Sequence, residues 1–239
     1  MKIAAITNIG YVRTKNQDAY TVIKNKAEDV LIIVCDGIGG NKAGEVASVE
    51  TIKHFERAFQ EQNFQRKEQV PAFLLNEISE VNNYILDLSI SHKEYEGMGT
   101  TITGILFSHY GDYIFNVGDS RTYGFLNNEM KQLTEDDSLV AEMVRMGEIT
   151  YEESLTHPKR HYLTKAIGVW DALNGEVKEI GKMDYYLCCS DGLHGYVSAD
   201  SIRKTVLGDL PLQEKTDALC RLALSSGGYD NITIVLIER

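Results

Sequence analysis

Basic residues are the minority among the charged residues of this 239-residue chain, with 24 Lys and Arg against 35 Asp and Glu. The formal net charge of −11 argues against nucleic acid or an anionic membrane as the main partner. An acidic excess is common among soluble proteins, but it also suits a protein whose carboxylates hold cations. We therefore expect no nucleic-acid partner.

The chain has no long hydrophobic run. The longest, such as Val30 to Cys35, are far too short to cross a bilayer, so we expect no membrane insertion. The N-terminus contains no long apolar stretch and no cleavage-like site, which predicts no signal peptide. Hydrophobic residues still make up 43% of the chain, enough for a core, and the length fits a single domain over residues 1–239.

Cysteine is scarce, and its spacing fits neither a C-x-x-C motif nor a zinc site. The four cysteines (Cys35, Cys188, Cys189 and Cys220) form no C-x-x-C pair, and no His/Cys cluster has zinc-ligand spacing. Most of them lie inside apolar, strand-like runs, so we interpret them as reduced, buried residues. Such cysteines are typical of a cytoplasmic protein, and we expect a monomer there.

The apolar pattern predicts strands in groups and helices in pairs. Apolar residues spaced 4, 3, 4 and 3 positions apart indicate a helix over residues 71–90. Two further helices are predicted over 42–60 and 212–225, with short helices within 135–170. The predicted strands are 2–7, 29–35, 99–108, 112–118, 121–127, 176–180, 184–189 and 231–237, with another following Asp18. This order predicts an α+β fold, a four-layer α/β/β/α sandwich of two antiparallel sheets flanked by helices.

The candidate site residues are aspartates that sit beside strand-like runs, at turns. They are Asp18, Asp36, Asp119, Asp191 and Asp230. One aspartate at such a position usually serves the turn, because its side chain bonds nearby backbone N–H groups. A set of them points to Mg²⁺ or Mn²⁺, which prefer hard oxygen ligands, and whose charge would relieve the repulsion between carboxylates. Gly37, beside Asp36, would let a backbone carbonyl come close to an ion.

Arg13 is the candidate phosphate-binding residue. Its planar guanidinium matches a phosphate dianion at two points. A lone arginine beside a strand is more often a solvated surface charge, and we interpret Arg121 as structural support.

Six motifs carry a resemblance to a known family. They are GYVR-x-x-NQD, VCDGIGG, GTT, NVGDSR, SDGL and DNIT, in this order from Gly10 to Thr233. Each alone is weak, but the ordered set resembles the metal-dependent protein phosphatases, the type 2C serine/threonine phosphatases. The compact chain is similar to the bacterial branch of that family, whose members commonly oppose membrane-anchored serine/threonine kinases.

The resemblance implies hydrolysis of phosphoserine and phosphothreonine by a hydroxide that bridges two Mn²⁺ or Mg²⁺ ions, without a phosphoenzyme. It implies that Asp36 bridges both ions and that Gly37 offers its carbonyl to one of them. Asp191 and Asp230 would complete the first ion site. The implied partners are phosphoprotein substrates and a serine/threonine kinase.

The remaining site residues have finer implied roles. Asp18 would lie near the second ion, directly or through water, and Asp119 with Asp191 would hold a weaker third ion. Arg13 matches the phosphate-binding arginine of the family. Residues 135–170 resemble the flap subdomain that borders the active site. Thr100 and Thr101 match a strand motif that we interpret as structural.

Departures from the family pattern leave some roles open. Gln17 stands where some relatives have a glutamate, and Asp137 stands where flap motifs often have histidine. Ile38 replaces a histidine that serves as proton donor in animal-type relatives, so the donor would be a metal-bound water or a side chain such as His194; we favour the water. Two other functions stay possible on the sequence alone: a small-molecule or nucleotide phosphatase, and an inactive module that binds phosphoproteins.

Overall fold

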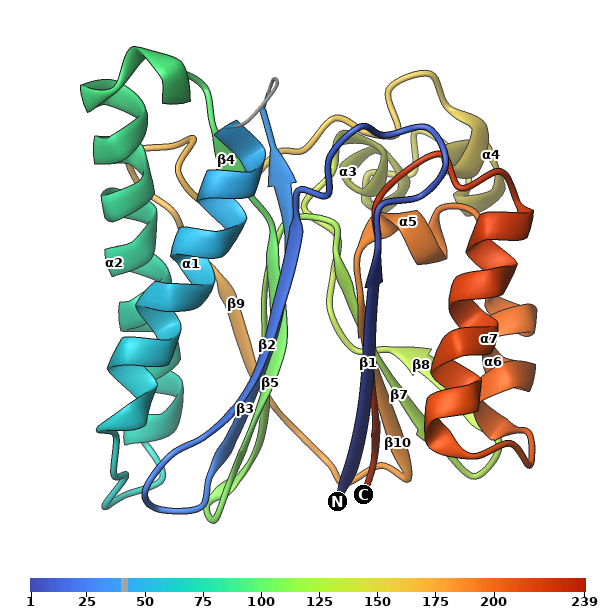
Figure 1. Cartoon of the computed structure of the whole chain (residues 1–239), viewed down its shortest axis with the longest axis horizontal. Coiled ribbons are helices and arrows are strands. Elements are labelled where there is room, and N and C mark those ends of the chain that lie inside the picture. Colours follow the sequence, from blue (N-terminus) through green and yellow to red (C-terminus); the bar gives the residue numbers. More distant parts are fainter. Residues whose placement is uncertain (40–42) are drawn as a thin grey trace.

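Two antiparallel β-sheets stand face to face in the computed structural model, which describes residues 1–39 and 43–239 (Figure 1). One sheet has the order β1 (Lys2–Asn8), β11 (Ile232–Glu238), β10 (Tyr185–Cys189), β7 (Arg121–Leu126) and β8 (Glu129–Gln132). The other has the order β2 (Asp18–Lys24), β3 (Val30–Ile38), β5 (Ile102–Ser108), β6 (Gly111–Val117) and β9 (Glu176–Ile180), with β4 (Gly99–Thr100) paired to β3.

Helices cover the outer faces of both sheets, which confirms the predicted four-layer α/β/β/α sandwich (Figure 1). The sheet that contains β3 is covered by α1 (Ala43–Gln60) and α2 (Gln69–Ser91), and a 3₁₀ turn follows at Lys93–Tyr95. The sheet that contains β11 is covered by α6 (Ala199–Leu207) and α7 (Leu212–Ser225). Three short helices, α3 (Leu139–Arg145), α4 (Tyr151–Thr156) and α5 (Asp191–His194), gather at one end of the sandwich (Figure 1).

Side-chain alternation along β3 explains where the site lies. Leu31, Ile33 and Cys35 pack in the cluster under α1 and α2, whereas Ile32 and Val34 pack between the two sheets. Successive side chains of a strand point to opposite faces, so the next residue on the inter-sheet face is Asp36. The apolar core between the sheets therefore ends at a carboxylate.

Two glycines allow α1 to lie close against β3. A Cβ atom on Gly37 would come within 2.2 Å of the Gly44 carbonyl oxygen, and one on Gly44 within 2.7 Å of Gly37. Any side chain at either position would push the helix away from the strand. The glycine beside Asp36 thus has a packing role in addition to any role in the site.

Several predicted elements need correction. β3 continues through Asp36 to Ile38, because it pairs with β2 and β4 there, so Asp36 does not follow the strand. The predicted strand 99–108 is divided at Thr101. The sequence pattern missed β8, α5 and α6, which are short or carry few apolar residues. Gly40 of the glycine-rich motif and Lys42, where a helix was predicted to begin, lie outside the described residues.

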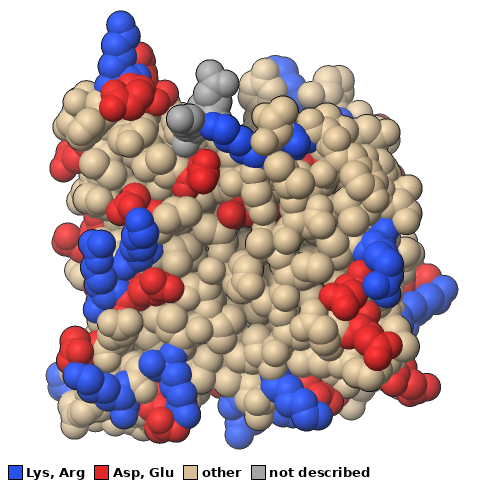
Figure 2. Space-filling view, viewed as in Figure 1, with Lys and Arg blue, Asp and Glu red and all other residues tan. Residues whose placement is uncertain are grey.

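Charged side chains are mixed on the face drawn in Figure 2, where basic and acidic groups lie beside one another. Among residues 1–39 and 43–239, no helix combines the length and the apolar character needed to cross a membrane.

Candidate active site

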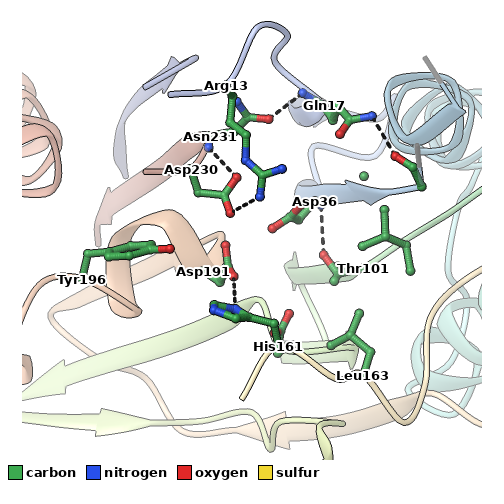
Figure 3. A pocket seen from close by; sticks show the side chains of 14 residues that line it. Arg13, Gln17, Asp36, Thr101, His161, Leu163, Asp191, Tyr196, Asp230 and Asn231 are labelled. Atoms are coloured by element: carbon green, nitrogen blue, oxygen red, sulfur yellow. Dashed lines mark hydrogen bonds and ion pairs between the residues drawn. The ribbon is translucent and has the colours of Figure 1, made fainter. Parts of the chain in front are cut away.

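A cavity of about 400 Å³ opens at the end of the sandwich where the inter-sheet core stops (Figure 3). Residues from both sheets and from the flap segment (residues 135–170) line it. Six of the seven predicted site residues are in its wall: Arg13, Asp36, Gly37, Asp119, Asp191 and Asp230. The seventh, Asp18, is buried and lies opposite Asp36 in the β2–β3 ladder.

Two threonines hold the backbone of Asp36. The Asp36 amide donates to Thr101 Oγ1 at 2.9 Å, and the Thr101 amide donates to the Asp36 carbonyl at 2.8 Å. Thr100 Oγ1 also donates to that carbonyl, at 2.9 Å. These bonds agree with the predicted structural role of both threonines. They fix the position of the Asp36 backbone, from which the carboxylate projects.

Ser190 joins the two sheets at Asp18. Its hydroxyl donates to Asp18 Oδ2 at 2.7 Å and accepts a hydrogen bond from the Thr233 amide at 3.0 Å. Ser190 belongs to the SDGL motif, but the motif alone indicates no role for it. Its only sequence signal is that it directly precedes Asp191, whereas its partner Asp18 is far away along the chain.

Asp119 lies in the turn between β6 and β7, and a flap residue holds that turn. The Asp137 amide donates to the Gly118 carbonyl at 2.9 Å, and the Gly118 amide donates to Asp137 Oδ2 at 3.2 Å. Asp137 also pairs with Lys165 Nζ at 2.7 Å. The aspartate that departs from the usual flap histidine therefore ties the flap segment to the backbone beside Asp119.

Arg13 and Asp230 meet across the cavity mouth. Arg13 Nη2 donates to Asp230 Oδ2 at 2.7 Å, and the Arg13 side chain is 51% exposed (Figure 3). The side chain of Asn231 holds the loop that carries Arg13. Its Nδ2 donates to the backbone carbonyls of Ile9 and Lys15, both at 2.9 Å, and its Oδ1 accepts a hydrogen bond from the backbone amide of Gln17. The sequence gave no hint of this clamp beyond the position of Asn231 next to Asp230.

Burial and mutual repulsion perturb the carboxylates. The pKa values of Asp18, Asp36, Asp119 and Asp230 are all raised, and that of Asp18 reaches about 7. Desolvation by burial is the largest cause in each case. Charges on neighbouring aspartates act in the same direction. The pKa of Asp191 is lowered instead, because burial, which would raise it, is outweighed chiefly by the nearby imidazole of His161.

His161 and His194 lie differently with respect to the cavity. His161 lines the cavity, and its Nδ1 is 3.8 Å from Asp191 Oδ2, a position that sequence reasoning missed. His194 does not line it; its Nε2 is 2.9 Å from the Asp119 carbonyl oxygen, to which it donates as a neutral imidazole. Burial, followed by the charge of Arg121, lowers the pKa of His194 to about 4.

The donor set fits hard divalent cations. Asp18 Oδ1 and Asp191 Oδ1 are buried and have no hydrogen-bond partner among the described residues. Within 1–39 and 43–239, no group of three or more His, Cys, Asp or Glu side chains is arranged to hold one metal ion. Asp36, Asp191 and Asp230, the predicted carboxylate ligands of the first ion, line one cavity without being closed into such a group. Asp230 meanwhile pairs with a cationic side chain, Arg13.

Known proteins match the chain along nearly its whole length. A family model described as protein phosphatase 2C matches residues 11–231. The serine/threonine phosphatase stp of Listeria welshimeri is 38% identical over 236 residues, which cover 98% of this chain and 94% of that protein. Protein phosphatase PhpP of Streptococcus pneumoniae is 34% identical over an alignment of 242 residues, covering 100% and 97% of the two chains.

Solved structures agree with this match. The crystal structure of serine/threonine phosphatase Stp1 from Staphylococcus aureus has a TM-score of 0.94 at 34% identity, covering 100% of this chain and 94% of that one. The Mycobacterium tuberculosis serine/threonine phosphatase PstP/Ppp has a TM-score of 0.84 at 31% identity, covering 99% and 97%. The fold and the full-length relatives thus define a serine/threonine protein phosphatase. The chain belongs to the protein phosphatase 2C family.

Proposed function

We propose that this phosphatase removes phosphate from phosphoserine and phosphothreonine in proteins with Mn²⁺ or Mg²⁺ ions held by its aspartates. The observation that carries the proposal is the convergence of carboxylates from both sheets at one end of the sandwich, two of them with an unpartnered buried oxygen among the described residues. Buried carboxylates without a cation repel one another and resist ionisation. Divalent ions would remove that cost.

Four of the predicted site residues are assigned to two metal ions. Asp36 would bridge both ions, Gly37 would offer its carbonyl, and Asp191 and Asp230 would complete the first. When bound, the ions would supply Lewis-acid stabilisation of the phosphoryl oxygens and an activated water. The protein's own part is to hold Asp36 through its backbone bonds to Thr100 and Thr101.

Two further aspartates have secondary roles in the proposal. Asp18 would lie near the second ion, held in place by Ser190. Asp119, together with Asp191, would hold a weaker third ion, with its turn held by Asp137. His194 supports Asp119 through the carbonyl and is not assigned a role on the substrate.

Arg13 would bind the phosphoryl group of the substrate. Its Nη2 is engaged with Asp230, and its Nη1 and Nε make no hydrogen bond among the described residues. The ion pair therefore keeps the guanidinium at the cavity while N–H groups stay free for phosphate oxygens.

The biological setting follows from this chemistry. A phosphoprotein phosphatase reverses the action of a serine/threonine kinase, so we assign such a kinase and its targets as partners. Residues 135–170 would act as the flap of one phosphatase domain spanning 1–239, in a monomeric protein. All four cysteines are free and buried, which supports a reducing, cytoplasmic location.

The test measures activity on two kinds of substrate and the effect of replacing one site carboxylate. With Mn²⁺, the protein should hydrolyse p-nitrophenyl phosphate and phosphothreonine peptides, and EDTA should abolish both activities. Asp36→Asn should lower kcat on the order of 100-fold or more, because a bound metal contributes several kcal/mol to the transition state. Asp87→Asn, on the exposed side of α2, is the matched control and should behave as wild type. Full activity in EDTA, or faster turnover of nucleotides than of peptides, would overturn the proposal.

A further inference from the structure

A second cavity, of about 370 Å³, adjoins the active-site cavity, and most of the residues that line it have no role in the chemistry above. Its lining residues come from the flap segment, which carries α3 and α4, and from the stretch from α5 to the start of α6. Four residues line both cavities: Asp119, His161, Asp191 and Tyr196. A polypeptide whose phosphoryl group reaches the aspartates would therefore pass directly beside the second cavity.

Two of the charged residues that line the second cavity are paired with each other. Arg121 binds Asp136 at two points, with Nη2 to Oδ2 at 2.6 Å and Nε to Oδ1 at 2.9 Å. Both side chains are largely buried, at 14% and 12% exposure. Because the two charges neutralise each other in a paired geometry, this pair offers no strong attraction to a phosphate or to a cation.

Apolar side chains form part of the lining of the second cavity, beside serines and Arg160, and some of them are open to solvent. Tyr151 and Leu155 are 53% and 54% exposed, and they lie four residues apart on α4, so they share one helix face. A capping box between Thr150 and Glu153 fixes the start of this short helix. The buried side chain of Val197 contributes to the same cavity from the other wall. Exposed apolar side chains gathered around a cavity mark a binding surface.

We propose that this cavity binds a nonpolar side chain of the phosphoprotein substrate, near in sequence to the phosphorylated residue. The inference rests on the proposed function, because it needs a polypeptide substrate. The shared lining identifies the occupant: a side chain on the same polypeptide can reach this cavity while its phosphoryl group faces Asp36 and Arg13. The volume lies within the range of about 300–1,000 Å³ that is usual for ligand sites.

The inference predicts a sequence preference in the substrate. A set of phosphothreonine peptides would carry a single leucine at successive positions around the phosphothreonine, in an alanine background. For wild type, one position should raise kcat/KM on the order of 10-fold over the all-alanine peptide, as expected for burial of one aliphatic side chain. The readout is the ratio of the leucine peptide to the alanine peptide for each variant.

Two variants change the cavity from opposite walls. Leu155→Gln keeps side-chain size and helix propensity but removes the apolar surface. Ala199→Phe would fill the cavity from the start of α6. Each should bring the ratio down to about 1-fold, the value for no preference. Ile90→Gln is the matched control, because Ile90 is 74% exposed and lines neither cavity; it should keep the wild-type ratio.

Each outcome has a separate meaning. Equal turnover of all peptides by wild type, or a leucine preference that survives both variants, would overturn the inference and leave the proposed function standing. No turnover of any peptide alongside hydrolysis of p-nitrophenyl phosphate would instead overturn the proposed function. If a second copy of the chain occupied the cavity, wild type would sediment as a dimer and Leu155→Gln as a monomer, which would also overturn the inference.

Discussion

Asp18 and Asp36 lie directly opposite each other across the β2–β3 ladder. Opposed residues in a ladder share a face, and here that face is the one turned toward the second sheet. Like charges in opposed positions are destabilising, and burial increases the cost. The protein therefore carries a built-in electrostatic strain that a cation would relieve.

The first prediction concerns pH and metal removal. Asp18 has a folded-state pKa of about 7, above its ordinary value, so its contribution to stability is present at low pH and is lost as pH rises through about 7. The metal-free protein should therefore melt at a lower temperature at pH 8 than at pH 5.5. Added Mg²⁺ should raise Tm more at pH 8, because protons no longer compete for the carboxylates. Thermal melts with EDTA or MgCl₂ at both values measure this.

Asp36→Asn is the control for this prediction. It removes one of the opposed charges, so the metal-free variant should be more stable than metal-free wild type at pH 8. It should also gain little from Mg²⁺. A Mg²⁺-dependent rise in Tm that is equal at both pH values, or larger at pH 5.5, would contradict the explanation.

A second prediction concerns Ser190, the hydroxyl between the sheets. Ser190→Ala leaves Asp18 Oδ2 and the buried Thr233 amide without this partner, and each unmade bond costs about 1–3 kcal/mol. The free energy of unfolding from urea titration should fall by about 2 kcal/mol or more, with an unchanged m value. Ser226→Ala, an exposed serine in a local helix-end bond, should change it by less than about 0.5 kcal/mol. Equal losses in the two variants would show that the inter-sheet bond does not contribute.

Sequence patterns could predict the layers of the fold because those layers depend on local periodicity. The stripe in α2 and the apolar runs of β3 and β11 are visible without any partner. β8 was missed because Glu129–Gln132 is a four-residue edge strand with exposed and half-buried positions only. The extension of β3 to Ile38 was missed because pairing with β2 and β4, and not local sequence, decides where it ends.

The residues of the site also differ in how far the sequence alone can identify them. Aspartates beside glycine-containing turns can be recognised one by one, and their order along the chain indicates a shared chemistry. The groups that hold them cannot be recognised so easily. Ser190 acts on Asp18 and Asn231 acts on the loop before β2, each across most of the chain length. Such contacts exist only after both sheets have assembled, so no local pattern encodes them.

The third prediction concerns Arg13. Arg13→Ala should raise KM for a phosphothreonine peptide by about 10- to 100-fold, the loss expected for charge-assisted hydrogen bonds of about 1.5–3 kcal/mol. Arg13→Lys keeps the charge but loses the planar fork, and it should give an intermediate KM. Calorimetric Mg²⁺ affinity should not fall in Arg13→Ala, since Asp230 loses a competing cation. Lost metal affinity with an unchanged KM would place Arg13 in the metal site instead.

The last prediction concerns the proton that the leaving group needs. A serine or threonine alkoxide is a poor leaving group, whereas p-nitrophenolate leaves without help, so loss of a general acid should slow peptides selectively. His194 is unsuited to that role: Nε2 is directed at the Asp119 carbonyl, and a pKa of about 4 keeps the imidazole neutral at pH 7. His194→Ala should therefore reduce kcat on both substrates by the same factor. His161→Ala is the matched variant, because that imidazole does line the cavity. A loss confined to the peptide in His194→Ala would make His194 the acid and contradict the assignment.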